Sequence, residues 1–202
     1  MYQTEVPSTA IPIPEGIKGL IFDLDGTIID SMPLHFKAYN YCLEPYGIKY
    51  DEETFFSRGG IPTKDTLLMI AKDNGIEDFD LEEVIKRKRE YVDTKIDQMK
   101  LIEPTMEVIK AYQSILPMAV GTGSNRKTVT AMFEMFDLNK YFEHSVTATD
   151  VQNFKPHPET FLKAAELIDI DPKDCLVFED GKPGMEAAIS AGMKVIDITQ
   201  YV

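Results

Sequence analysis

Hydrophobic and polar residues follow three successive patterns along the chain. The first apolar run, residues 17–22, ends on Asp23, Asp25 and Gly26 and predicts a short strand buried on both faces. From there to about residue 100 the apolar residues recur at helical spacing. Four residues suited to N-capping begin the expected helices: Ser31, Asp51, Thr63 and Asp80. We expect these helices over residues 31–44, 51–56, 63–74 and 80–99.

The third pattern is an alternation of helix and strand that begins at Pro104. Such alternation is typical of βαβ units and a parallel sheet. We therefore predict an α/β fold: a Rossmann-like parallel sheet core formed by residues 1–30 and 101–202, with an all-helical domain, 31–100, inserted into it. Residues 1–16, which contain three prolines, form an irregular lead-in. The expected strands are 118–120, 145–148, 175–178 and 194–198, and the expected helices are 104–114, 125–136, 159–168 and 183–191.

Polar side chains follow most of the predicted strands. Because the carboxyl ends of parallel strands share one edge of the sheet, these groups should converge there. Four carboxylates in one place need a compensating cation, and oxygen ligands suit Mg²⁺ rather than zinc. The converging residues are Asp23, Asp25, Thr122, Ser124, Lys155, Glu179 and Asp180.

Composition narrows the possible partners and the compartment. The net charge of −13 argues against nucleic acid or an anionic membrane as a partner, although a local basic pocket can still bind a small anion. Cys42 and Cys175 fall in apolar segments, which favours buried free thiols in a reducing, cytoplasmic setting. No apolar run approaches the length of a membrane span, and the N-terminus lacks the pattern of a signal peptide.

Each polar cluster has an ordinary alternative when it is taken alone. The segment 121–128 resembles a nucleotide-binding loop, but Arg126 stands where that loop has its second glycine, so a plain glycine turn into a helix is the alternative. Lys155 alone fits a surface lysine, and Glu179 with Asp180 fits an acidic helix start. The joint order of these clusters at strand ends favours a single site.

The chain resembles the haloacid dehalogenase superfamily, and within it the β-phosphoglucomutase-like sugar phosphatases, closest to the fructose-1-phosphate and 6-phosphogluconate phosphatase type. The resemblance rests on DLDGT at 23–27, Thr122 at a strand end, Lys155 followed by Pro156, and VFED at 177–180. The helical insert resembles the cap domain of this subgroup. Gly181 stands where relatives often carry a serine.

The resemblance implies a Mg²⁺-dependent phosphatase. Asp23 would be the nucleophile that forms an aspartyl phosphate, and Asp25 would act as the acid and base. The metal would be held by Asp23, the backbone carbonyl of Asp25, and Asp180, with Glu179 in support. The phosphoryl oxygens would be bound by Thr122, Ser124, Asn125 and Lys155.

Three residues of the cap bear on the substrate. Thr63 stands where the family's mutases carry an arginine for a second phosphate, which favours hydrolysis of a small sugar phosphate over phosphate transfer. Lys88 matches a basic cap position, within a run (86–89) that otherwise fits a solvated helix face. His35 matches a cap residue associated with proton transfer, and its alternative is a partly buried helix-face histidine. β-Phosphoglucomutase activity and a non-catalytic phosphate-binding role remain alternatives. A monomer or weak dimer is expected.

Overall fold

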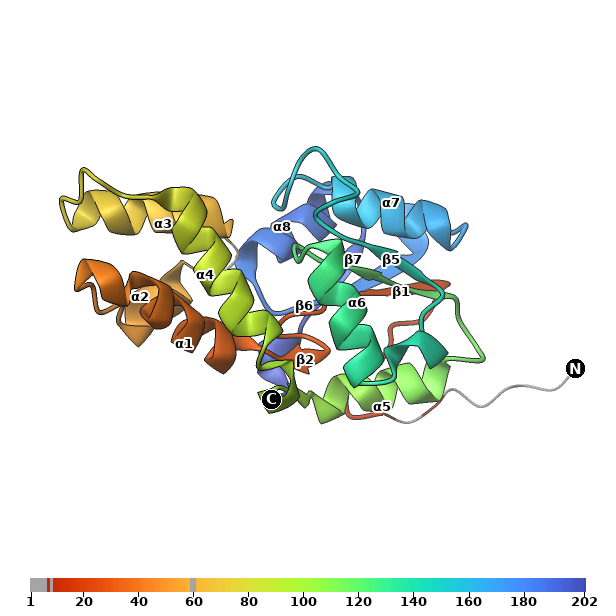
Figure 1. Ribbon diagram of the computed structural model, residues 1–202. Coiled ribbons are helices and arrows are strands. Elements are labelled where there is room, and N and C mark those ends of the chain that lie inside the picture. Colours follow the sequence, from red (N-terminus) through yellow and green to blue (C-terminus); the bar gives the residue numbers. More distant parts are fainter. Residues whose placement is uncertain (1–6, 8, 59–60) are drawn as a thin grey trace, which may run out of the picture.

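The computed structural model describes residues 7, 9–58 and 61–202. The expectations for most of the lead-in, and for Gly59 and Gly60, lie outside these residues. Five parallel strands form the main sheet in the order β5-β4-β1-β6-β7 (Figure 1). The strands are β1 (Gly19–Phe22), β4 (Met118–Gly121), β5 (His144–Val146), β6 (Cys175–Glu179) and β7 (Lys194–Asp197). The predicted parallel sheet is confirmed.

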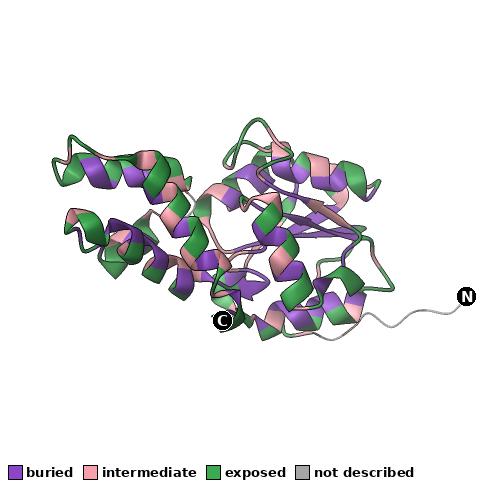
Figure 2. Cartoon of the chain, viewed as in Figure 1, coloured by how far each residue is buried: buried purple, intermediate pink, exposed green. Residues whose placement is uncertain are grey.

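β1 lies at the centre of the sheet because its residues pair on both sides. Leu20 is opposite Met118 of β4 and Leu176 of β6. Every residue of β1, β4 and β6 is buried, as expected for parallel strands covered on both faces (Figure 2). This central, inflexible position fixes where the chain emerges at Asp23.

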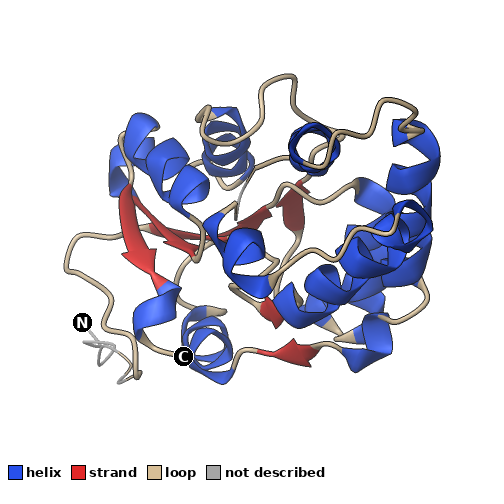
Figure 3. Cartoon of the chain, turned by 90° about the vertical axis from the view of Figure 1, so that its left-hand side faces the viewer, coloured by secondary structure: helices blue, strands red, loops and turns tan. Residues whose placement is uncertain are grey.

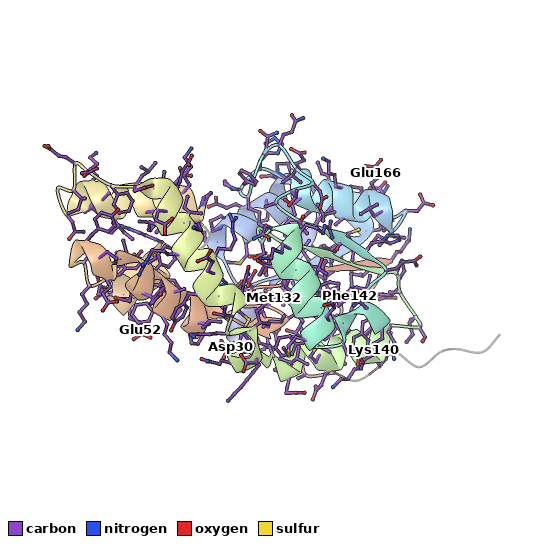
Figure 4. The ribbon with its side chains drawn as sticks, viewed as in Figure 1. Asp30, Glu52, Met132, Lys140, Phe142 and Glu166 are labelled. Atoms are coloured by element: carbon purple, nitrogen blue, oxygen red, sulfur yellow. The ribbon has the colours of Figure 1, made fainter. Side chains whose placement is uncertain are left out.

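Helices cover both faces of the sheet (Figure 3). One face packs against α5 (Glu103–Tyr112) and α6 (Arg126–Met135), and the other packs against α7 (Glu159–Leu167) and α8 (Lys182–Ser190). On the first face, Phe142 contacts Phe22 edge-on at a centroid distance of 5.7 Å, and Met132 belongs to the same cluster (Figure 4). Phe22 also stacks on Phe178 at 4.6 Å, which ties β1 to β6.

The helical region between β1 and β4 packs around a separate hydrophobic cluster that includes Leu43, Phe55 and Leu67. It contains α1 (Met32–Leu43), α2 (Glu52–Ser57), α3 (Thr63–Asp73) and α4 (Leu81–Asp93). Two short antiparallel strands, β2 (Ile29–Asp30) and β3 (Lys100–Leu101), join it to the core. The predicted α/β fold with an inserted helical region is confirmed, while the division at 31 and 100 stays a prediction.

Two local expectations were wrong, and two short strands were not predicted. The helix expected over 80–99 ends at Asp93, because the Lys95 N–H donates to the carbonyl of Val92, three residues back, and a separate 3-10 turn, η2 (Ile96–Gln98), follows. Thr63 is the first residue of α3 rather than its cap. Strands β2 and β3 are too short to leave a periodic signal. The remaining 3-10 turns are Glu44–Tyr46, Leu138–Lys140, Pro172–Asp174 and Ile198–Gln200.

Within the described residues, none of the helices has both the length and the apolar character required to cross a membrane.

Candidate active site

Asp23 lies at the carboxyl end of the central strand. Its backbone N–H donates to the carbonyl of Phe178 at 2.9 Å, so the residue is still held by the sheet although β1 has ended. The residue is only 5% exposed. Its pKa is raised well above the ordinary value by burial and then by the negative charge of Glu179, while Lys155 opposes both effects.

Lys155 is the cation that compensates these acids. Its Nζ donates to Asp23 Oδ1 at 2.6 Å and to Glu179 Oε2 at 2.8 Å, and it lies 4.5 Å from the centre of the Phe161 ring. Burial alone would lower the pKa of this lysine, but the charges of Asp23 and Glu179 raise it above its ordinary value. The lysine is therefore firmly charged in the free site, in contrast to the surface-lysine alternative.

A third acid, Asp180, completes a group that fits a metal ion. One carboxylate oxygen from each of Asp23, Glu179 and Asp180 lies within 4.8 Å of the others. Burial, followed by the charge of Asp23, raises the pKa of Asp180 to about 7. An all-oxygen set that repels itself in this way fits Mg²⁺, which prefers hard oxygen ligands and offsets their charge.

Two glycines allow these carboxylates to approach. A Cβ at Gly26, whose φ is +84°, would lie 2.1 Å from Asp180 Oδ2. A Cβ at Gly184, in the first turn of α8, would lie 2.1 Å from Glu179 Cδ. Any larger residue at either position would displace an acid, so the glycine of the DLDGT segment has a steric role in shaping the site.

Asp25 has a different environment from Asp23. Its Oδ1 accepts from Ser31 Oγ at 2.8 Å and contacts His35 Nε2 at 3.2 Å, while its Oδ2 accepts from Ser124 Oγ at 2.6 Å and from Thr122 Oγ1 at 3.5 Å. Burial opposes ionisation, but the hydrogen bond and charge of His35, followed by the two serine hydroxyls, lower the pKa of Asp25 below its ordinary value. Two carboxyls two residues apart thus have opposite pKa shifts.

The segment after β4 brings some of its predicted phosphate ligands to the carboxylates and directs another elsewhere. Thr122 and Ser124 face Asp25, and Thr122 Oγ1 also accepts from the backbone N–H of Ser124 at 3.0 Å. Asn125 instead caps α6: its Oδ1 accepts from Thr128 N at 3.1 Å and its Nδ2 donates to Thr128 Oγ1 at 3.0 Å. Its role in phosphate binding stays a prediction.

The cap residues also separate. His35 reaches the acids, whereas Lys88 is buried with its Nζ 4.5 Å from the centre of the Tyr39 ring. Burial lowers the pKa of Lys88 to about 8, although the negative charges of a Cys42 thiolate and of Asp25 would raise it. Burial raises the pKa of the same Tyr39 phenol, and the nearby side chain of Thr63 opposes that shift. Lys88 and Thr63 therefore share a neighbour in the helical region.

Two residues of the site were missed from the sequence. Ser31 occupies the N-cap position of α1 as expected, but its hydroxyl bonds Asp25 instead of a backbone N–H. Thr27 donates to Asp180 Oδ1 at 3.4 Å. Ser31 has the sequence context of an ordinary helix cap, so the sequence does not indicate that it contacts Asp25. Thr27 belongs to the DLDGT motif, which indicates the site but not the contact of Thr27 with Asp180.

Comparisons with known proteins assign the chain to a family. Residues 20–198 match the family described as haloacid dehalogenase-like hydrolase, and the chain belongs to it. The chain is 37% identical over 184 residues to the fructose-1-phosphate phosphatase of Escherichia coli, covering 91% of this chain and 97% of that protein. It is 32% identical over 184 residues to the phosphorylated carbohydrates phosphatase of Thermotoga maritima, covering 89% and 84% respectively.

A solved structure agrees with these sequence relatives. The crystal structure of β-phosphoglucomutase from Clostridium difficile superposes with a TM-score of 0.75 at 26% identity, covering 89% of this chain and 83% of that one. The resemblance to the β-phosphoglucomutase-like subgroup is confirmed, and the chain is a haloacid dehalogenase-like phosphatase.

Proposed function

We propose that this protein hydrolyses phosphate monoesters of small sugars or sugar acids through an aspartyl-phosphate intermediate. The observation that carries the proposal is the contrast between the two acids after β1. Asp23 contacts a firmly charged lysine, and Asp25 contacts a histidine and hydroxyls. Carboxyl pairs in divergent environments are characteristic of divided catalytic roles.

In the first step, Asp23 attacks phosphorus, the aspartyl P–O bond forms and the bond to the sugar oxygen breaks. The leaving alkoxide takes a proton from the Asp25–His35 pair, in which Asp25 Oδ1 and His35 Nε2 lie 3.2 Å apart. In the second step, Asp25 accepts a proton from water as that water attacks the aspartyl phosphate, and Asp23 is released. A lowered pKa keeps Asp25 available as this base.

Lys155, Thr122 and Ser124 would bind the phosphoryl oxygens, since they already surround the two acids. Asn125 would join them through the second hydrogen of its Nδ2, because only one is donated to Thr128. Mg²⁺ would be held by Asp23, the backbone carbonyl of Asp25, and Asp180, with Glu179 behind them, and would stabilise the negative charge of the transferring group.

The substrate class is inferred from the cap and from the relatives. Thr63 carries no charge, so this position offers no bidentate grip on a second phosphate of the kind that an arginine provides. Lys88 offers one positive charge, which suits a carboxylate or another single anionic group. The names of the Escherichia coli and Thermotoga maritima relatives support a phosphorylated carbohydrate.

Phosphate release from a panel of hexose and sugar-acid monophosphates tests this function. Turnover of at least one should exceed that of non-carbohydrate monoesters, and Lys88→Ala should raise KM most for substrates with a second anionic group. A second assay supplies β-glucose 1-phosphate with a trace of the 1,6-bisphosphate. Efficient formation of glucose 6-phosphate without phosphate release would replace the proposal with the mutase activity. Binding of these esters without any turnover would leave a non-catalytic phosphate-binding protein.

A further inference from the structure

A hydrogen-bonded chain connects the last residue of α4, in the helical region, to the loop after β4 in the core. Asp93 is the C-terminal residue of α4, and its side chain is 17% exposed. Its Oδ1 accepts from Thr128 Oγ1 at 3.1 Å, and its Oδ2 accepts from Lys127 Nζ at 3.1 Å. Thr128 belongs to the first turn of α6, which lies beside the end of α4 (Figure 1).

The directions of these hydrogen bonds are fixed by chemistry. An ionised carboxylate can only accept, so the single hydrogen of the Thr128 hydroxyl goes to Asp93. The lone pairs of that hydroxyl then accept from Asn125 Nδ2 at 3.0 Å. This in turn turns Asn125 Oδ1 toward the backbone N–H of Thr128, which it caps at 3.1 Å. Asp93 thus makes the Thr128 hydroxyl an acceptor for Asn125 Nδ2, and this supports the amide orientation that the Thr128 backbone N–H also requires.

Asn125 directly follows Ser124, whose hydroxyl donates to Asp25 at 2.6 Å. We infer that Asp93 is a positioning residue that acts through Thr128 and Asn125 to hold Ser124 against Asp25, so that the helical region helps to set the geometry of the phosphate loop. This inference rests on the proposed role of Asp25 as acid and base. Without Asp93, the Thr128 hydroxyl can donate to a carbonyl of the preceding turn instead.

The chain offers a matched control because Asp93 has two partners. Lys127 contacts the other oxygen of the same carboxylate, and its side chain is 80% exposed. Exposed ion pairs contribute little, so Lys127→Met should leave turnover within about twofold of the wild type. Thr128→Val removes the hydroxyl link, Asp93→Ala removes its acceptor, and Thr128→Ser keeps the hydroxyl.

The test measures kcat and KM for p-nitrophenyl phosphate at saturating Mg²⁺, with thermal unfolding recorded on the same samples. We expect Asp93→Ala and Thr128→Val each to lower kcat about tenfold with KM changed less than about twofold, because small misplacements of catalytic groups act on the chemical step. Thr128→Ser should restore the wild-type kcat. The double variant should be no slower than either single variant, as expected for one linked path.

Equal kcat values for Asp93→Ala and Lys127→Met would overturn the inference, and so would additive losses in the double variant. If Thr128→Val does not fold, the comparison of Asp93→Ala with Lys127→Met still decides. If Asp93→Ala keeps wild-type turnover while Asp23→Asn is inactive, the inference about Asp93 is wrong and the proposed function stands. If Asp23→Asn keeps its turnover, the proposed function is wrong.

Discussion

The α/β core and the inserted helical region bury charged groups in different ways. At the sheet edge, Lys155 is paired with two carboxylates at 2.6 and 2.8 Å, and Asp25 accepts from several hydroxyls. In the helical region, Lys88 is buried, yet its neighbour is the ring of Tyr39. Among the residues that the structure describes, none forms an ion pair with Lys88.

This difference between Lys155 and Lys88 fits the proposed function, in which the core carries out the reaction and the helical region selects the substrate. A satisfied ion pair fixes its members in one geometry, as a nucleophile and its lysine require. A buried ammonium without a carboxylate keeps its charge at a cost and is available to an incoming anion. Under the proposed function, the core would carry out the reaction and the helical region would select among substrates.

The largest expected effect tests the core. Asp23→Asn keeps the shape of the side chain but removes the nucleophile, so kcat should fall by about 10³-fold or more. The protein should stay folded, because burial already favours the neutral form of this group. Steady-state phosphate release and circular dichroism check both points.

Asp30→Asn is the control. Asp30 is exposed at the end of β2 (Figure 4), so this substitution should leave kcat unchanged. Near-normal turnover in Asp23→Asn would remove the basis for the core's proposed role.

The second effect concerns the metal. Chelation with EDTA should abolish phosphate release, and added Mg²⁺ should restore it, because the crowded acids Asp23, Glu179 and Asp180 need a cation. Asp180→Ala should raise the Mg²⁺ concentration for half-maximal activity by about tenfold or more, the range seen when groups around a metal are removed. Asp174 is not one of these acids and pairs with Lys18 on the surface, so Asp174→Ala should leave that Mg²⁺ concentration unchanged. Full activity after exhaustive dialysis against chelator would contradict the assignment.

The sequence predicted the core better than it predicted the insert. Strand ends could be placed because the apolar runs of β1, β4 and β6 stop abruptly at polar residues, and parallel pairing then brings those residues together. The end of α4 was misplaced by six residues. The apolar spacing continues through Ile96 and Met99, and both side chains are buried although the helix has ended.

Tertiary contacts explain what could not be predicted at the site. Ser31 and Asn125 both stand at helix N-caps, where local preference is the same for either residue. In the folded chain Asn125 caps its helix, while Ser31 turns to Asp25. Asp25 is only six residues from Ser31, but whether Ser31 contacts it depends on how the turn after β1 and α1 are placed in the folded chain, and the preference for N-cap residues does not contain that information.

The smallest expected effect tests the helical region through pH. The pKa of Lys88 is about 8 in the folded chain, below its usual 10.5, and burial is the main cause. Below pH 8 the lysine is charged in both states and the folded state bears the full cost of burying it, on the order of 2–3 kcal/mol with the Tyr39 contact included. Between pH 8 and 10.5 the unfolded state binds more protons, so the free energy of unfolding rises with pH. Lys88→Met should therefore be more stable than the wild type at pH 7 by about 2 kcal/mol, with the advantage shrinking toward pH 10. Urea unfolding at several pH values measures this difference.

The control is Lys86→Met, on the same helix but exposed. Its stability should differ little from that of the wild type, and the difference should not vary with pH. A Lys88→Met advantage that stays constant from pH 7 to 10 would mean that the buried ammonium bears no such cost, and the contrast between the two regions would not hold.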